Sequence, residues 1–291
     1  MNNLVLQQIA ARSYWLPPDS ATDRPLLGVV AGSRGALIVD AGNSPAHAGI
    51  LQAELAARGI RPRFCALTHW HWDHVFGAAA LGLPTAAHHE TARIVRVLAG
   101  LSWSDAALDE RVAAGTEIAF CRDMLRAELP DRSELVLAPP ELIFGAELTI
   151  DLGDLTCRII HVGGDHAHDS SVVFVPEQRV VFLGDCMYDD LHHGDRRLTT
   201  RELFPLLDQL LALEADFFLA GHQEPMSRAE FEADAALLRA IGTAVKGIGD
   251  DRAAVLDALP ALLGIPLADD HAEIADAFLA GLRMPFVASV L

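Results

Sequence analysis

Lysine is almost absent from this chain of 291 residues, in which Lys246 is the only one. With 22 basic residues against 40 acidic ones, the formal net charge is -18. The chain therefore has no Gly-Lys-Ser/Thr phosphate loop, and a Schiff-base mechanism has almost no candidate residue. The negative charge repels phosphate groups, so we expect neither a nucleic acid nor an anionic membrane as a partner.

Cysteine and long apolar runs are scarce as well. The four cysteines, Cys65, Cys121, Cys157 and Cys186, lie far apart without a Cys-x-x-Cys pair, so we expect reduced core residues rather than a disulfide framework. No apolar run approaches the ~18 residues of a membrane helix. The first residues lack the basic start and apolar segment of a signal peptide, which predicts a cytoplasmic location. A hydrophobic content of 51% indicates a soluble globular protein with a large core.

Histidine, in contrast, is concentrated in one stretch. Four potential metal ligands, His69, His71, Asp73 and His74, follow directly after the apolar run 64–67, which predicts a buried strand. In an extended chain the side chains of His69 and His71 share a face and can bind one metal. Asp73 and His74 are neighbours, so their side chains should point in different directions, which suits a second metal beside the first. The alternative is a polar turn that happens to be rich in histidine. Zinc and similar divalent ions accept imidazole and carboxylate ligands.

Three later apolar runs also end close to a residue that can bind a metal. In each case a glycine stands directly before that residue or one position further back, and glycine lets the backbone turn sharply at the end of a strand. Loops at one end of a sheet are where sites are usually built. The residues reached in this way are His166, Asp185 and His222.

Helical segments are predicted around this β-rich region. Pro45 and Gly59 are good start and stop signals for a helix over residues 45–58. Residues 90–130 are rich in Ala, Leu, Arg and Glu and predict a helical insertion, which would be either a lid or a contact between subunits of a homo-oligomer. We therefore expect one domain over residues 1–225 and a C-terminal helical extension over residues 226–291.

The chain resembles the metallo-β-lactamase superfamily, whose signature is His-x-His-x-Asp-His at the end of a strand. The resemblance implies an α/β fold, an αββα sandwich of two mixed β-sheets flanked by helices. It also implies two metal sites. The first metal would be held by His69, His71 and His166, and the second by Asp73, His74 and His222, with Asp185 bridging the two.

Two divalent ions ~3.5–4 Å apart share a water and lower its pKa toward ~7, which gives a hydroxide at neutral pH. We expect zinc, with manganese or iron as alternatives, and we expect Asp73 to orient the nucleophile. The leading hypothesis is a dinuclear metal-dependent hydrolase of a small ester, lactone, thioester or lactam. One alternative is a mononuclear iron persulfide dioxygenase of the same fold, and another is a non-catalytic metal-binding scaffold.

Tyr188 follows Asp185 at the spacing of a substrate-polarising tyrosine in the lactonases that the chain resembles. It would be a catalytic residue, or it packs in its loop with the hydroxyl in water. Because Asp185 is present, Cys186 is interpreted as a buried bystander rather than a ligand. Four further histidines are interpreted as solvated turn residues: His88, His89, His192 and His193. Trp70 and Trp72 alternate with the ligands and are interpreted as scaffold, or either could instead form a wall of the substrate cleft.

Overall fold

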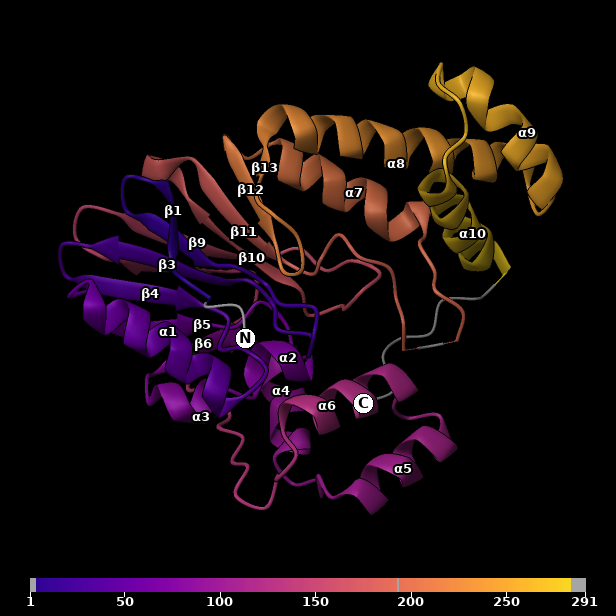
Figure 1. Ribbon diagram of the computed structural model, residues 1–291. Coiled ribbons are helices and arrows are strands. Elements are labelled where there is room, and N and C mark those ends of the chain that lie inside the picture. Colours follow the sequence, from indigo (N-terminus) through magenta and orange to yellow (C-terminus); the bar gives the residue numbers. More distant parts are fainter. Residues whose placement is uncertain (1–3, 193, 284–291) are drawn as a thin grey trace.

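The computed structural model describes residues 4–192 and 194–283. Two β-sheets face each other and helices cover their outer faces (Figure 1). The first sheet has the strand order β1-β2-β3-β4-β5-β6-β7, antiparallel from β1 to β4 and parallel from β4 to β7. Its strands are β1 (Gln7–Ala10), β2 (Ser13–Leu16), β3 (Leu27–Gly32), β4 (Gly35–Val39), β5 (Pro62–Ala66), β6 (Thr85–His88) and β7 (Leu142–Phe144).

The second sheet has the order β13-β12-β11-β10-β9-β8 and is antiparallel except for the β11–β12 pair. Its strands are β8 (Glu147–Asp151), β9 (Thr156–His161), β10 (Ser171–Val175), β11 (Val180–Gly184), β12 (Phe217–Ala220) and β13 (Met226–Ser227). Both sheets are therefore mixed, and the predicted αββα sandwich is confirmed.

Helices pack on the outer face of each sheet. The first sheet shares a hydrophobic cluster with α1 (Pro45–Ala57), α2 (Trp72–Val75), α3 (Ala78–Leu81), α4 (His89–Leu98), α5 (Asp105–Ala114) and α6 (Ala119–Glu128). The second sheet carries α7 (Thr200–Leu211), and α8 (Arg228–Ile248), α9 (Arg252–Leu263) and α10 (Asp269–Arg283) join the same hydrophobic cluster. A short 3₁₀ helix (Pro176–Gln178) links β10 to β11.

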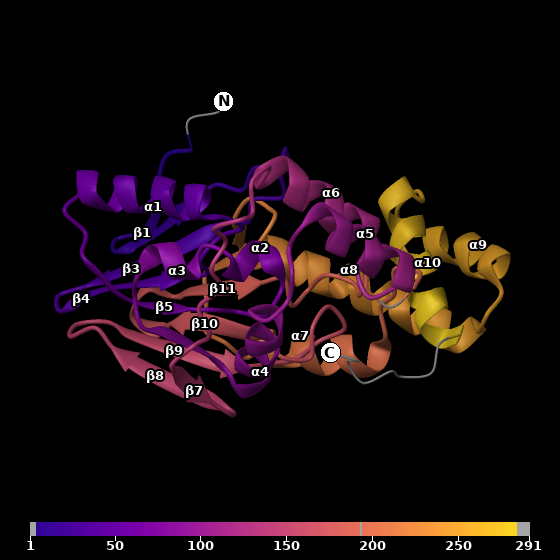
Figure 2. The same ribbon diagram turned by 90° about the horizontal axis from the view of Figure 1, so that it is seen from below.

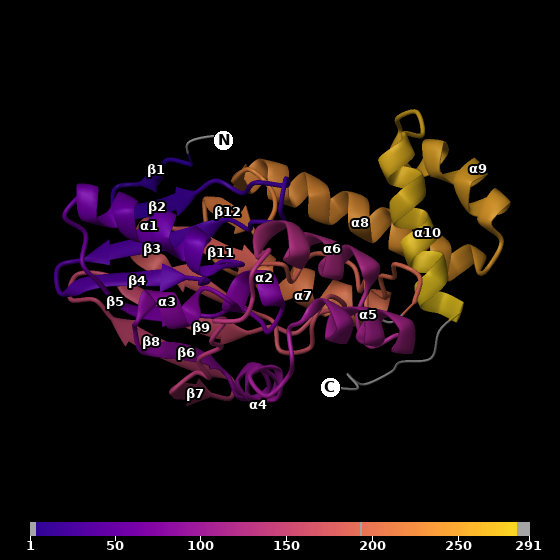
Figure 3. The same cartoon turned by 60° about the horizontal axis from the view of Figure 1, so that its bottom comes forward.

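Local sequence signals explain where several helices begin. The Ser44 hydroxyl accepts a hydrogen bond from the His47 amide at 2.9 Å, and Pro45 occupies the first turn of α1, as predicted. Ser227 and Glu230 form a capping box at the start of α8. The helices of the insertion, α4–α6, and those of the C-terminal extension, α8–α10, lie toward the same end of the sandwich (Figures 2 and 3).

The two sheets are held together by an apolar layer between them. Trp15 and Leu37 of the first sheet belong to the same buried cluster as Val173 and Phe182 of the second. Burial of apolar surface stabilises the fold by ~25 cal/mol per Å². Because the sheets close on this layer, the strand ends of both sheets meet at one edge, where the potential ligands lie.

The strand predicted at residues 64–67, the helix predicted over residues 45–58 and the helical insertion predicted over residues 90–130 correspond to β5, α1 and α4–α6, whereas the short helix α2 was not predicted. The strands β2, β7, β8 and β13 were not predicted; they are short, and β7 and β8 expose much of their surface, so they lack a clear apolar pattern. The interpretation of His88 as a solvated turn residue is wrong: His88 is buried at the end of β6 and stacks on His161, with 4.0 Å between ring centroids. Within residues 4–192 and 194–283, no helix is long and apolar enough to cross a membrane.

Candidate metal centre

Seven side chains of ligand type converge in two adjacent groups. The first group consists of His69, His71 and His166, all buried. The second consists of Asp73, His74, Asp185 and His222, of which only His222 is partly exposed. Within each group, one potential ligand atom from each residue lies within 4.8 Å of all the others. The structure thus brings together every residue that the sequence nominated as a ligand.

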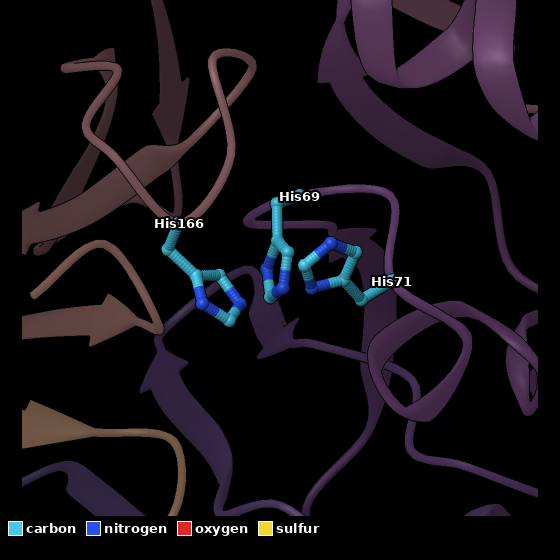
Figure 4. A group of neighbouring side chains, drawn as sticks. All are labelled: His69, His71 and His166. Carbon is cyan, nitrogen blue, oxygen red and sulfur yellow. The ribbon is translucent and has the colours of Figure 1, made fainter. Parts of the chain in front are cut away.

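The first group is built where β5 ends. Thr68 anchors this chain segment, because its amide donates a hydrogen bond to the Asp40 Oδ1 atom at 2.8 Å. The imidazole rings of His69 and His71 then lie edge to face with centroids 4.6 Å apart, and the His166 ring centroid lies 4.5 Å from that of His71 (Figure 4). The three rings point toward a common centre from two different sheets.

The geometry of the second group differs from the prediction. Asp73 and His74 do not diverge, because the extended chain ends at His71 and α2 starts at Trp72. This helical turn brings the His74 Nε2 atom to 3.1 Å from the Asp73 Oδ2 atom. The His74 Nδ1 atom lies 2.8 Å from the buried Asp40 carboxylate, which leaves Nε2 for a metal.

The second sheet supplies the remaining ligands from separate strand ends. The His166 Nδ1–H donates to the Asp189 carbonyl at 3.0 Å when Nε2 faces the site. The Asp185 Oδ2 atom lies 3.3 Å from Nε2 of both His74 and His222 and 3.6 Å from Nε2 of His166. Asp185 therefore stands between the two groups, where a bridging ligand is needed.

Orphaned polar atoms show that these residues fit metal ions. Among the described residues, no hydrogen-bond partner exists for the buried Nε2 atoms of His69, His74 and His166 or for Oδ1 of Asp185. Leaving such an atom unsatisfied costs ~1–3 kcal/mol. Imidazole nitrogen and carboxylate oxygen are ligands of divalent transition metals, so bound ions would satisfy all four atoms.

The electrostatics of the two groups differ. Burial lowers the pKa of His69 and of His71 well below the usual value, so both rings are neutral and present a lone pair. Burial also opposes the charged form of His222, but the carboxylates of Asp185 and Asp73 outweigh it and raise its pKa to about 11. The second group therefore concentrates negative charge that attracts protons or metal cations.

Asp23 is a residue of this site that the sequence did not reveal. It lies in the connection between β2 and β3 with a left-handed backbone (φ 58°), and its Oδ1 atom is 3.6 Å from the His222 Nδ1 atom. Burial and the nearby Asp73 raise the pKa of Asp23 to about 7. Only the tertiary fold brings Asp23 close to His222. The sequence around Asp23 has no strand-end pattern of an apolar run and a glycine, so no local signal could have revealed it.

Tyr188 and Cys186 occupy different surroundings. The Tyr188 hydroxyl accepts a hydrogen bond from the His222 amide at 3.2 Å, so it is not simply solvated. Burial raises the Tyr188 pKa well above its usual value, so the phenol keeps its proton. Cys186 is buried in the hydrophobic cluster of the second sheet and belongs to neither ligand group. Whether Tyr188 acts on a substrate stays a prediction.

A cavity of about 240 Å³ opens beside the second ligand group. The helical insertion contributes Ile118, Phe120 and Cys121 to its wall, and half of the Phe120 surface is exposed there. His192 also lines it, with its ring centroid 4.6 Å from that of His71, so the solvated-turn interpretation of His192 is wrong. His193 lies outside the described residues.

The two predicted scaffold tryptophans differ in burial. Trp72 is buried in α2 and also lines the cavity, whereas Trp70 is only partly buried and packs its ring 4.4 Å from that of His71. Both therefore support the ligand loop.

A comparison with models of known protein families identifies the family of this chain. The model of the metallo-beta-lactamase superfamily matches residues 26–222, a segment that contains all seven potential ligands. Because this match spans more than half of the sequence, the chain belongs to the metallo-β-lactamase superfamily. A comparison with curated proteins found no match.

Solved structures of the same fold are similar to this chain. A metallo-beta-lactamase from Pontibacter korlensis has 18% identity and a TM-score of 0.57, with 81% of this chain and 99% of that one covered. A metallo-beta-lactamase family protein from Thermus thermophilus has 19% identity and a TM-score of 0.56, with 96% and 92% covered. The stereoselective inverting sec-alkylsulfatase Pisa1 from Pseudomonas sp. has 14% identity and a TM-score of 0.61, with 84% and 43% covered. At these identities the likeness shows the fold alone.

Proposed function

We propose that this protein is a dinuclear metal-dependent hydrolase of a small ester, lactone, thioester or lactam, with zinc as the native metal. The observation that carries the proposal is the pair of complete ligand groups, with Asp185 between them and four buried ligand atoms that have no hydrogen-bond partner among the described residues. When bound, the ions supply a nucleophilic hydroxide at neutral pH and stabilise negative charge on the reacting oxygen.

The protein side chains have separate tasks in this proposal. His69, His71 and His166 would hold one ion through imidazole nitrogens, and Asp185 would connect the two sites. Asp73 orients the nucleophile, because its carboxylate lies 3.1 Å from Nε2 of both His74 and His222 at the edge of the cavity. Tyr188 donates its hydroxyl proton in a hydrogen bond to the substrate carbonyl as this becomes an oxyanion.

The surroundings of the site support a small-molecule substrate. The cavity of about 240 Å³ has room for a compact acyl compound, and α6 covers one side of it. The net charge of -18 disfavours nucleic acids and anionic membranes as partners. We propose a cytoplasmic location, and contact between subunits through the insertion stays a prediction.

Two ions are favoured over one because the second group is complete. A mononuclear iron dioxygenase would need one ion, whereas here four ligand-type residues surround a second position and His74 is oriented by Asp40. Metal analysis separates the two hypotheses, since the hydrolase should bind about two ions per chain and the dioxygenase one iron.

The test is a substrate screen with zinc-loaded protein. Esters, lactones, thioesters, lactams and phosphodiesters are offered to the wild type and to Asp185→Asn, and the metal content of both is measured. We expect hydrolysis of an acyl substrate by the wild type with about two ions per chain. A chain that binds no metal, or binds two ions and hydrolyses none of the acyl classes, contradicts the proposal.

A further inference from the structure

A second cleft adjoins the metal-site cavity and is built in part by the C-terminal helices. It has a volume of about 230 Å³ and lies between the loop after β11 and the helices α8 and α10. Tyr188, Asp189 and Arg196 line both this cleft and the metal-site cavity. The two spaces are therefore neighbours that share these three residues in their walls, directly beside the ligands His166 and His222.

We infer that this cleft is a substrate subsite, which receives an apolar arm of the substrate whose far end is uncharged or cationic. The inference rests on the proposed function, because it assumes that the reacting group sits at the metal ions. It assigns a role to the C-terminal helices, which lie outside the matched family segment 26–222.

The lining of the cleft is mainly apolar. Six side chains that present aliphatic or thioether surface come from the loop after β11, from β13, from α8 and from α10: Met187, Leu198, Met226, Leu237, Leu238 and Ile274. Most of them are only partly buried, so they still expose apolar surface to the cleft. Burial of each substrate methylene against such a surface strengthens binding ~3- to 4-fold.

The charges around the cleft select against an anionic arm. Asp234 of α8 faces Asp270 and Glu273 of α10 across it. Burial and the nearby Asp270 raise the Asp234 pKa, as expected for crowded carboxylates. Among the described lining residues Arg196 is the one cation, and its Nε donates to the Asp189 carboxylate at 2.7 Å. An arm that ends in a carboxylate would therefore meet net negative charge, whereas an ammonium group would be attracted.

The junction between the two spaces determines how an arm would pass. The Asp189 carbonyl accepts from His166 and its carboxylate accepts from Arg196, so this residue is held in place on both sides. The Tyr188 hydroxyl is held by the His222 amide. A substrate with its reacting carbonyl at the ligands would extend past Tyr188 and Arg196 into the cleft.

Alkyl hydroxamates test this subsite without requiring turnover. Their headgroup binds a metal ion, and the chain is lengthened from acetohydroxamate to octanohydroxamate while affinity for the zinc-loaded protein is measured by calorimetry. We expect affinity to rise ~3-fold per methylene until the cleft is filled, and then to level off.

Matched variants locate the arm. Ile274→Trp fills the cleft and should remove the gain with chain length while acetohydroxamate binds as before. Ala236→Trp places the same ring at an exposed position of α8 outside the cleft and should change nothing. If Ile274→Trp does not fold, Leu238→Ala is used, which removes apolar lining and should reduce the gain per methylene.

The charge of the arm is tested with two probes of equal length. We expect 6-aminohexanohydroxamate to bind at least ~10-fold more tightly than the hydroxamate that ends in a carboxylate, a ratio within reach of a few nearby charges in a partly buried site. The double variant Asp270→Asn with Glu273→Gln should narrow this ratio.

The outcomes separate this inference from the proposed function. If even acetohydroxamate fails to bind zinc-loaded protein, the metal site of the proposed function is wrong. If acetohydroxamate binds and chain length has no effect, or if Ile274→Trp keeps the full gain, the subsite inference alone is overturned. Preference for the carboxylate-ended probe would contradict the assigned charge selectivity.

Discussion

The two ligand groups differ in charge and in the residues that support them. The first group contains three buried imidazoles, whereas the second combines two carboxylates with two histidines. The supports follow the same division. His69 Nδ1 lies 3.1 Å from the Thr68 hydroxyl and His166 Nδ1 faces the Asp189 carbonyl, both neutral partners. His74 and His222 instead face the carboxylates of Asp40 and Asp23.

Because of this difference, we expect the two metal positions to differ in the metal ions that they accept. Nitrogen-only ligation favours zinc over harder ions, whereas a site with two carboxylates also accepts manganese or iron. A carboxylate behind a ligating histidine raises its basicity and fixes its ring. We therefore expect the first group to determine which metal binds and the second group to bind its own ion mainly through charge. The following variants test this difference between the two groups.

The largest effect is expected at Asp185, because it lies within reach of both groups. Asp185→Asn keeps the shape and removes the charge, so turnover should fall by at least ~1,000-fold, the scale of losing a main source of transition-state stabilisation. Bound metal should fall below two ions per chain. Cys186→Ser is the neighbouring control and should keep its metal, because the thiol packs in the core. The reverse ranking would make Cys186 a ligand.

Tyr188→Phe should lower turnover by ~100- to 1,000-fold, as for removal of one oxyanion donor. The hydroxyl is held by the His222 amide and keeps its proton, so it can donate toward the cavity. Metal content should stay the same, because the phenol belongs to neither ligand group. Unchanged turnover in a variant with full metal would leave Tyr188 as a packing residue.

Asp23→Asn tests the charged support of the second group. We expect affinity for the second ion to weaken by ~10- to 100-fold, the usual cost of losing an outer partner of a ligand, with the first ion retained. Titration of metal-free protein with Co²⁺ measures the two affinities separately. Asp195→Asn removes the same charge from an exposed position and serves as the control. Equal weakening of both ions in Asp23→Asn would contradict the proposed division.

The smallest effect on metal binding is expected for Thr68→Val, which alters a neutral support. The Thr68 hydroxyl lies 2.9 Å from Asp40 Oδ2 and 3.1 Å from His69 Nδ1, so its loss leaves buried polar groups without a partner. Stability should fall by ~1–3 kcal/mol in thermal or urea unfolding. Both ions should remain bound; loss of the first ion would show that the neutral support matters as much as a carboxylate.

The sequence predicted the parts of the site that depend on local patterns. The ligands of residues 69–74 are contiguous, and His166, Asp185 and His222 each follow an apolar run and a glycine. Asp23 could not be found in this way, because its contact with His222 exists only after β2 and β3 have folded against β12. The subsite cleft joins a loop to helices far along the chain, so no local pattern encodes it.

Local patterns also failed where elements are short. The four-residue helix α2 is too short for a helical period, so the extended geometry predicted for Asp73 and His74 was wrong. The strand β7 exposes two of its three residues and shows no alternation. The helix α1, in contrast, was predictable because its start and stop signals agree.

Gly221 and Gly184 constrain how this protein can be changed by laboratory evolution. A methyl group at position 221 would collide with the Asp185 carboxylate, and one at position 184 would collide with the Thr68 side chain in a backbone of φ 53°. Both positions are therefore closed to substitution, whereas Phe120 and Ile274 line open space. Variants selected from a random library for a new substrate should accordingly carry substitutions in the helices that line the cavity and the cleft. The residues that carry out the reaction should stay the same in these variants.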